Sequence, residues 1–399
     1  MNKNIKLAVA GAVLALGATA ANAGIIIPAG EWSVDLSGNV NAFYTQNRFT
    51  GGGVTDGLTA GANDGSSRSS SNITTGLLPN FLSLSASTRQ NDLDTTWLIS
   101  INPGGPSAAP LAGGSGSEFR QAYFTFGDKS WGSVKLGKDL GIYASDAILN
   151  DMTLLGVGAG GGNRSTSTTT LGRIGSGFMY ADWKEQVAYT TPNFSGFQAT
   201  VGVTQAWNTT AASSTYGLVS TGRGGASPAF EGKASYAFAS GDSSGKIWVS
   251  GFSQKVQGAA AGETVAWAGD IGFNANLGAF GLTGYYYGGE GVGITAMLRN
   301  GYTSAGAKRD SDGGYIQATY TMPSKTKIGL AWGQSNLDLN SGESVTTLVK
   351  EQRLTTVGIY HPLTKHLNLV AEYNNAQASS TSNASQTVNN VSLGGILFF

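Results

Sequence analysis

Apolar and polar residues alternate with a period of two along most of the chain, which is the pattern of β-strands with two different faces. A clear example begins at Glu31, where Trp, Val and Leu side chains occupy one face and Ser, Asp and Asn side chains occupy the other. Similar alternation recurs at 264–277, 366–374 and 390–399. Beyond the N-terminal stretch, no segment has the roughly 18 consecutive apolar residues of a membrane-spanning helix. The sequence therefore predicts an all-β fold.

The connections between these segments also alternate, between long stretches rich in Gly, Ser, Thr and Asn and short turns. The long loops are expected near 49–78, 103–117, 140–172, 208–228, 257–263, 288–312, 335–351 and 375–388. The short turns are expected near 89–93, 127–132, 191–195, 239–244, 276–279, 322–325 and 360–365. Long loops at one end and tight turns at the other are typical of outer-membrane barrels. We therefore expect a transmembrane 16-stranded antiparallel β-barrel with long external loops and short periplasmic turns.

A soluble β-sandwich or β-propeller would alternate as well. A sandwich of this length would need two domains joined by a linker, and a propeller would repeat a four-stranded unit. The sequence has neither a break in composition nor such a repeat. Aromatic residues gather near expected strand ends, as in Tyr285, Tyr286 and Tyr287, where an interfacial girdle would lie. These features favour the barrel.

The N-terminus has the features of an export signal. Lys3 and Lys6 precede a short apolar stretch, and small residues lead up to a cleavage point after Ala23. We expect a signal peptide over 1–23 and a single barrel domain over 24–399.

The charge balance of the chain and its reactive side chains exclude several classes of function. Charged residues make up only 12% of the chain, and 24 basic side chains balance 24 acidic ones, which removes the case for a nucleic-acid partner. There is no cysteine, and the two histidines, His361 and His366, lie at an expected short turn. That position does not suit a histidine-dependent nucleophilic site among the long loops. We expect no enzymatic activity and no cofactor.

Four segments, in this order, resemble the Gram-negative general diffusion porin family. The stretch at 32–38 resembles the first porin strand, and 119–141 resembles a family segment with an arginine, an aromatic strand, a turn and a second strand. The stretch at 189–199 resembles a Tyr-x-x-Pro-x-Phe-x-Gly-Phe segment, and Phe399 matches the C-terminal aromatic residue of the family.

The resemblance implies a homotrimer in the outer membrane of a Gram-negative bacterium, surrounded by lipid and lipopolysaccharide. Each barrel would let small hydrophilic solutes and ions diffuse passively through its own pore. The resemblance also implies that the third long loop, 140–172, folds into the barrel and narrows it. The barrel assembly machinery would recognise Phe399.

The resemblance also suggests a pore constriction in which acidic loop residues face basic residues of the wall. Arg120 matches the wall arginine of the family, and alternation turns Lys135 and Lys184 toward the lumen. On the loop side, Asp146 and Asp151 match the acidic positions. Opposed charges across a narrow throat are weakly screened and would orient polar solutes.

The chain departs from the family pattern at two places. Leu155-Gly156-Val157-Gly158 stands where the family has Pro-Glu-Phe-Gly, and Ala181-Asp182 stands where related porins often have another wall arginine. We therefore predict a weak ion preference that leans toward anions. A substrate-specific channel remains open as an alternative, although most strand aromatics fall on the expected lipid face. The second alternative is a structural or adhesive surface barrel whose Ser/Thr/Gly-rich loops bind outside partners.

Overall fold

The computed structural model describes residues 24–58, 69–103, 117–159, 169–209, 211, 214, 215, 217, 227–258 and 262–399. The expected signal peptide and its cleavage point at Ala23 lie outside these residues, as does part of the third long loop. Within the described ranges, no helix is both long enough and apolar enough to cross a membrane.

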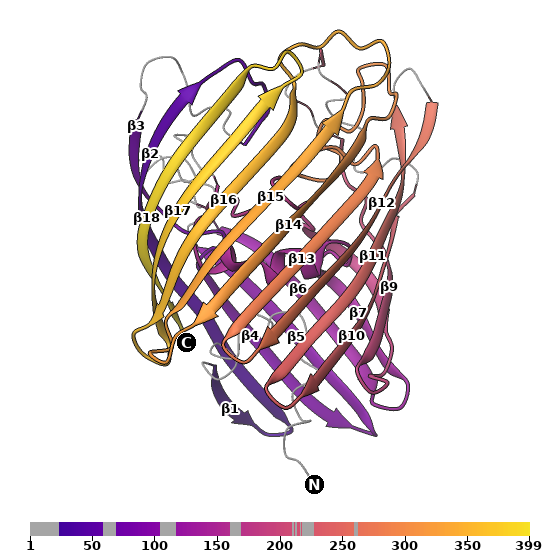
Figure 1. The fold of residues 1–399 in the computed structure, drawn as a ribbon. Coiled ribbons are helices and arrows are strands. Elements are labelled where there is room, and N and C mark those ends of the chain that lie inside the picture. The colour runs from indigo at the N-terminus through magenta and orange to yellow at the C-terminus, as the bar shows by residue number, and fades with distance from the viewer. Residues whose placement is uncertain are drawn as a thin grey trace.

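Sixteen strands form a closed antiparallel barrel, which confirms the fold class expected from the sequence (Figure 1). Each strand pairs with its neighbours in the chain, and the last pairs with the first to close the cylinder. The barrel strands are β2 (Trp32–Gly51), β4 (Phe81–Gln90), β5 (Leu93–Pro103), β6 (Ser117–Asp128), β7 (Gly132–Leu140), β8 (Trp183–Thr190), β9 (Phe197–Thr204), β10 (Ala229–Ser240), β11 (Ser243–Gly258), β12 (Gly262–Leu277), β13 (Phe280–Glu290), β14 (Asp310–Thr321), β15 (Lys327–Asp338), β16 (Val349–Pro362), β17 (Leu367–Ser380) and β18 (Ser385–Phe398).

Two short strands supplement the barrel. β1 (Ile25–Ala29) pairs with the lower part of β2, below the region of β2 that pairs with β18. β3 (Ser69–Thr74) pairs with the upper part of β2, and β4 pairs with its lower part, so both lie on the same side of β2. Gly38 and Phe399 exchange backbone hydrogen bonds of 2.8 and 3.1 Å, which fasten the C-terminus to β2.

The strand faces follow the alternation of the sequence. On β2, Val40 and Tyr44 are 58% and 48% exposed on the outer surface. The residue after each of them, Asn41 and Thr45, is buried. The same outward apolar face appears at Ile271 and at many positions around the cylinder. This is the arrangement that a lipid exterior and a polar interior require.

Two local expectations were wrong. Tyr285 and Tyr287 are buried inside the barrel, and only Tyr286 faces outward, so this run does not form an external girdle. The loop between β17 and β18 spans only 381–384 rather than 375–388. The strands continue there with polar residues such as Asn375 and Gln377 on the outer face, because a strand that rises above the bilayer no longer needs an apolar exterior.

Candidate functional site

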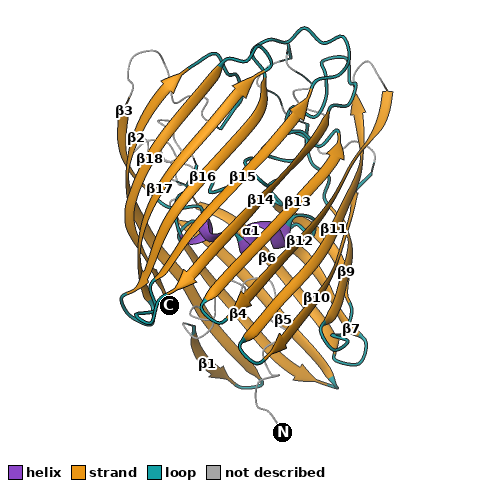
Figure 2. Cartoon of the chain, in the orientation of Figure 1, coloured by secondary structure: helices purple, strands orange, loops and turns teal. Residues whose placement is uncertain are grey.

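The described parts of the third long loop, residues 141–159 and 169–182 between β7 and β8 and called loop 3 here, lie inside the barrel (Figure 2). It contains the helix α1 (Ser145–Asn150) and the 3₁₀ turn η2 (Met152–Leu155). Its side chains and backbone contact lumen-facing residues of the far wall. Tyr315 on β14 donates a hydrogen bond to the Ala147 carbonyl at 2.8 Å, and Met152 donates its N–H to Gln317 at 2.7 Å.

A glutamate of the wall holds the beginning of loop 3. The Glu231 carboxylate on β10 accepts the backbone N–H groups of Ile142 and Tyr143 at 2.7 and 2.9 Å. It also accepts a hydrogen bond from Thr204 and pairs with Lys184, and both charged side chains are almost completely buried. Each charge therefore satisfies the other, which is the condition under which buried charges are tolerated.

A second glutamate holds the tip of the loop in the same way. The Glu372 carboxylate on β17 accepts the N–H groups of Val157 and Gly158, each at 2.9 Å. Tyr360 and Asn374 donate further hydrogen bonds to the same carboxylate at 2.7 and 3.1 Å. A Cβ atom at Gly156 would stand 1.8 Å from Glu372 Oε1, so glycine is required for this close approach.

Asp146, on α1, lies between two lysines of the wall. Its carboxylate pairs with Lys233 on β10 at 3.2 Å and with Lys246 on β11. Burial alone would raise the pKa of the Asp146 carboxyl, but the charges and hydrogen bonds of the two lysines outweigh it and hold that pKa below its usual value. Asp146 therefore stays ionised at neutral pH and ties α1 to the wall.

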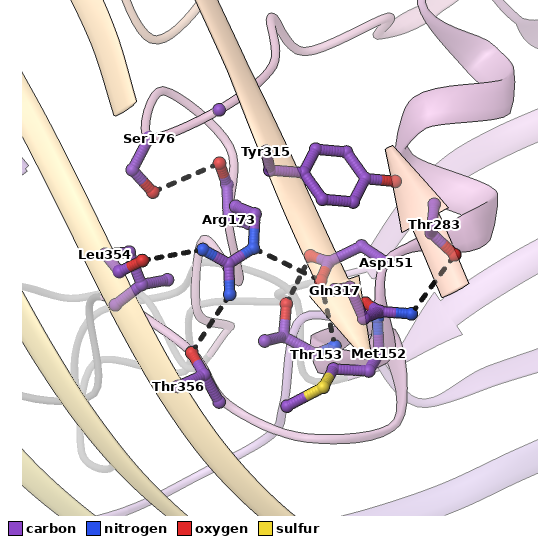
Figure 3. Close-up of polar contacts among 12 residues, drawn as sticks. Asp151, Met152, Thr153, Arg173, Ser176, Thr283, Tyr315, Gln317, Leu354 and Thr356 are labelled. Atoms are coloured by element: carbon purple, nitrogen blue, oxygen red, sulfur yellow. Dashed lines mark hydrogen bonds and ion pairs between the residues drawn. The ribbon is translucent and has the colours of Figure 1, made fainter. Parts of the chain in front are cut away.

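Asp151 and Arg173 form a pair within loop 3 that no solvent reaches (Figure 3). Arg173 Nε lies 3.5 Å from Asp151 Oδ1, and its terminal nitrogens donate to the Leu354 carbonyl at 2.8 Å and to Thr356 at 3.2 Å. Asp151 also caps η2 by accepting the N–H of Thr153. This pair joins the outgoing and returning halves of loop 3 to β16.

The residues expected at the constriction are dispersed. Lys135 pairs with Asp139 on its own strand, and Lys184 pairs with Glu231. Arg120 is half-buried at an irregularity of β6, where the two residues between Glu118 and Gln121 stand opposite a single residue of β5. None of these three cations is shown opposite Asp146 or Asp151, whose cationic partners are Lys233, Lys246 and Arg173.

A second loop also folds inward. Residues 291–309, called loop 6 here, were expected to be external, yet Val292, Ile294 and Leu298 are completely buried. Gln352 on β16 links the two loops by donating to the Gly175 carbonyl of loop 3 and to Thr295 of loop 6, both at 2.8 Å. Loop 6 therefore packs against loop 3 inside the barrel.

Loops 3 and 6 fill one side of the lumen. The buried apolar cluster there joins loop residues to lumen-facing aromatic residues of β11, β13 and β14. It includes Tyr143, Ala147, Phe178, Met179, Val292, Leu298, Trp248, Phe252, Tyr285, Tyr287 and Tyr315. Inward aromatic side chains are thus present, but in this cluster they lie beneath the loops.

On the other side, a cavity of about 490 Å³ lies between loop 3 and the wall. The wall contributes polar and charged residues of β5, β6 and β7, including Asn102, Arg120, Gln121 and Asp139. Loop 3 contributes both apolar and polar residues. The apolar ones are Ile148, Leu149, Leu154, Leu171, Ile174 and Tyr180, and the polar ones are Thr169, Thr170 and Asp182.

The important residues that the sequence interpretation missed are Glu231, Glu372, Lys233, Lys246 and Arg173. The alternation already placed Glu372 on the polar face of its strand, and Glu231 follows the outward Phe230. An acidic residue on the lumen face of a strand was therefore a usable signal. No periodicity indicated Arg173, because it lies in irregular chain.

A closed barrel with an apolar exterior and an internal loop beside a polar wall defines an outer-membrane diffusion channel. The chain belongs to the Gram-negative porin family, whose model matches residues 8–383. It accordingly resides in the outer membrane of a Gram-negative bacterium. A comparison with curated protein sequences finds no match.

Solved structures with the same fold include three outer-membrane proteins. The outer membrane channel DcaP of Acinetobacter baumannii is 18% identical, with a TM-score of 0.65 over 94% of this chain and 100% of that one. An anion-selective porin from Comamonas acidovorans is 17% identical, with a TM-score of 0.60 over 92% and 100%. OmpT of Vibrio cholerae is 14% identical, with a TM-score of 0.57 over 94% and 100%. At these identities the likeness concerns the fold.

Proposed function

We propose that small solutes diffuse passively through the space between loop 3 and the wall formed by β5, β6 and β7. One observation carries this proposal: the loops pack tightly against the wall of β11 to β16, whereas the 490 Å³ cavity lies on the opposite side. No energy source is needed, because solutes move down their own gradients.

The absence of cysteine from the chain makes a direct test possible. The purified protein in a planar bilayer should give stepwise ohmic conductance in potassium chloride. Leu149→Cys places a thiol on the cavity, and modification with a bulky thiol reagent should reduce the conductance. Val249→Cys, at an outward position of β11, is the matched control and should not respond. Absence of conductance, or equal responses of the two variants, would contradict the proposal.

We also infer that the protein has no enzymatic activity. His361 lies near the end of β16 and His366 directly before β17, and His361 is hydrogen-bonded to Thr326 at 2.9 Å. The purified protein should not hydrolyse ester or phosphoester substrates. Turnover that His361→Ala abolishes would overturn this inference.

We further propose that the channel is a homotrimer. The support is the shared fold and the trimer form named for OmpT of Vibrio cholerae, which covers 92% of this chain with a TM-score of 0.52. Unheated protein extracted in mild detergent should have three times the protein mass of the heated chain in light scattering. A monomeric mass would contradict the proposal.

Phe399 remains our proposed recognition signal for the barrel assembly machinery. Its backbone is fastened to Gly38, so its deletion also removes one closing contact. Phe399→Ser keeps the backbone and should still lower insertion into the outer membrane, whereas Phe399→Tyr should not. Equal insertion of both variants would show that the terminal side chain is not read.

A further inference from the structure

We propose that Asp56 is a positioning residue that sets the largest solute able to pass the channel. It lies in residues 52–58, the described chain that follows β2 and is called loop 1 here. Asp56 acts by holding loop 6 against loop 3. This inference rests on the proposed function and adds to it a determinant of solute size.

The Asp56 carboxylate joins loop 1 to loop 6, and its side chain is almost completely buried. Oδ1 pairs with the Arg299 guanidinium, and Oδ2 accepts the side-chain amide of Asn300 at 2.6 Å. Strands β15 to β18 stand between β14 and β2 in the wall. The contact therefore joins two distant parts of the barrel rim.

A second contact joins loop 1 to the same pair of loops. The buried side chain of Gln352 accepts the Leu58 N–H of loop 1 at 2.5 Å. Its amide nitrogen donates to Gly175 of loop 3 and to Thr295 of loop 6, both at 2.8 Å. One side chain of β16 thus binds loops 1, 3 and 6 together.

Loop 1 is itself fixed to the chain between β15 and β16. Thr55 donates its N–H to the Thr347 carbonyl at 2.7 Å, and its own carbonyl accepts the Val349 N–H at 3.0 Å. An apolar cluster surrounds this contact and includes a residue of loop 6. Its buried members are Val54, Ile294, Leu337, Leu348, Val349 and Ala378. Asp56 therefore holds loop 6 from a fixed support.

The tip of loop 6 contacts a residue that lines the cavity. Tyr180 of loop 3 lines the cavity and donates its N–H to the Thr295 carbonyl at 3.3 Å. Solutes pass between loop 3 and the opposite wall, so the space open to them depends on how firmly loop 3 is supported. Releasing loop 6 from Asp56 weakens this support and lets loop 3 yield to a larger solute.

The test compares two neutral sugars, arabinose and the larger raffinose, because a change in protein charge does not act directly on them. Swelling of proteoliposomes gives the permeability ratio of raffinose to arabinose. Arg299→Gln and Asp56→Asn each remove the ion pair, and asparagine tolerates the left-handed backbone of residue 56, whose φ is 66°.

Loss of a partly exposed ion pair shifts a loop equilibrium by up to roughly fivefold. Both variants should therefore raise the sugar ratio by up to that factor, while the rate for arabinose is unchanged. Failure of arabinose to pass the wild type would contradict the proposed function itself. Passage of arabinose with an unchanged ratio in either variant would overturn this inference alone.

The matched control is Lys308→Gln. Lys308 is another cation of loop 6, and its side chain is 32% exposed against 36% for Arg299, but it pairs with Glu290 of the adjoining strand β13. This variant should keep the wild-type ratio, and so should Arg299→Lys, which retains a cation for Asp56. An equal change in Lys308→Gln, or an equal rise in the rates of both sugars, would overturn the inference.

A thiol on loop 6 gives a second readout that needs no solute flow, because the chain has no cysteine. Ala296→Cys places it beside Thr295 at the half-buried tip. A maleimide should label it faster in the Arg299→Gln background than in the Lys308→Gln background. Equal labelling would show that Asp56 does not hold loop 6. Faster labelling with an unchanged sugar ratio would show that loop 6 does not limit solute size, and either result overturns the inference.

Discussion

The carboxylate of Glu372 on β17 accepts two consecutive backbone N–H groups of loop 3, those of Val157 and Gly158, each at 2.9 Å. Val157 and Gly158 belong to the stretch Leu155-Gly156-Val157-Gly158, which has no charged side chain. The wall supplies a negative charge here, and that charge holds the backbone of the loop.

Replacing Glu372 with Gln should loosen the tip of loop 3. Hydrogen bonds to a charged group contribute about 1.5–3 kcal/mol. The loop N–H groups share Glu372 Oε2, and a neutral amide oxygen in its place accepts them more weakly. Single-channel recordings should show larger current fluctuations than the wild type. Glu351→Gln is the control, because Glu351 pairs with the exposed Arg353 instead of with loop 3. Current fluctuations in the Glu372 variant no larger than in the wild type would show that this contact does not fix the loop.

The buried pair of Arg173 and Asp151 should respond differently to single and double substitution. Arg173→Met leaves the Asp151 carboxylate buried without its partner, a change that typically costs about 3–5 kcal/mol. Loop 3 should then become accessible to a broad-specificity protease. Arg173→Met/Asp151→Leu removes both charges and should restore much of the protection.

The control for this pair is Arg89→Met at the periplasmic end. Arg89 is half-exposed and paired with Asp94 and Asp128, and exposed pairs contribute at most about 1 kcal/mol. The Arg89→Met variant should be as resistant to the protease as the wild type. If Arg173→Met is equally resistant, the buried pair does not hold loop 3.

How far the sequence predicts this structure depends on how local each interaction is. Strand faces follow from period-two alternation, so the outward positions Val40 and Leu393 were accessible from the sequence alone. The pair of Lys135 and Asp139 was accessible too, because residues four apart on a strand share a face. The pair of Lys184 and Glu231 was not, since it joins residues distant in sequence on β8 and β10.

The inward fold of loop 6 was equally hidden. Its glycine-rich sequence is what an external loop would also have, and only contacts such as Gln352 with Thr295 draw it into the lumen. Likewise, matching Asp146 and Asp151 to the family pattern identified acidic side chains but not their partners. Partners are set by how the loop packs, which a period-two pattern does not encode.

The outward face of the barrel can be tested at adjacent residues of β4. Leu84 is 41% exposed on the outer surface near the middle of the strand, and Ser85 faces the lumen beside Asp35. Leu84→Arg should reduce the amount of folded, heat-modifiable protein in the outer membrane, because arginine on the lipid face costs about 2–4 kcal/mol at mid-bilayer. Ser85→Arg should assemble normally. Equal assembly of the two variants would mean that the faces are reversed or that Leu84 does not meet lipid.

The ion pairs of Asp146 predict both a charge effect and a pH effect on ion selectivity. Asp146→Asn leaves Lys233 and Lys246 in the lumen without their carboxylate. The zero-current potential in a potassium chloride gradient should therefore move toward anion preference. The shift should shrink with salt, because the Debye length falls from about 10 Å at 0.1 M to about 3 Å at 1 M.

Acidification should reproduce this shift in the wild type, and only below the ordinary pKa of an aspartate. The pKa of Asp146 is held below its usual 3.8, so the carboxylate remains charged as pH falls from neutral toward that value. The stabilisation from the two lysines is complete above the unfolded pKa and is lost as pH falls through the lower folded pKa. Zero-current potentials measured in low salt should thus show no contribution from Asp146 between about pH 5 and 7. Below about pH 3.8 they should move toward anion preference in the wild type, and less in Asp146→Asn. Identical pH profiles of the two proteins would show that the charge of Asp146 does not reach the solute path.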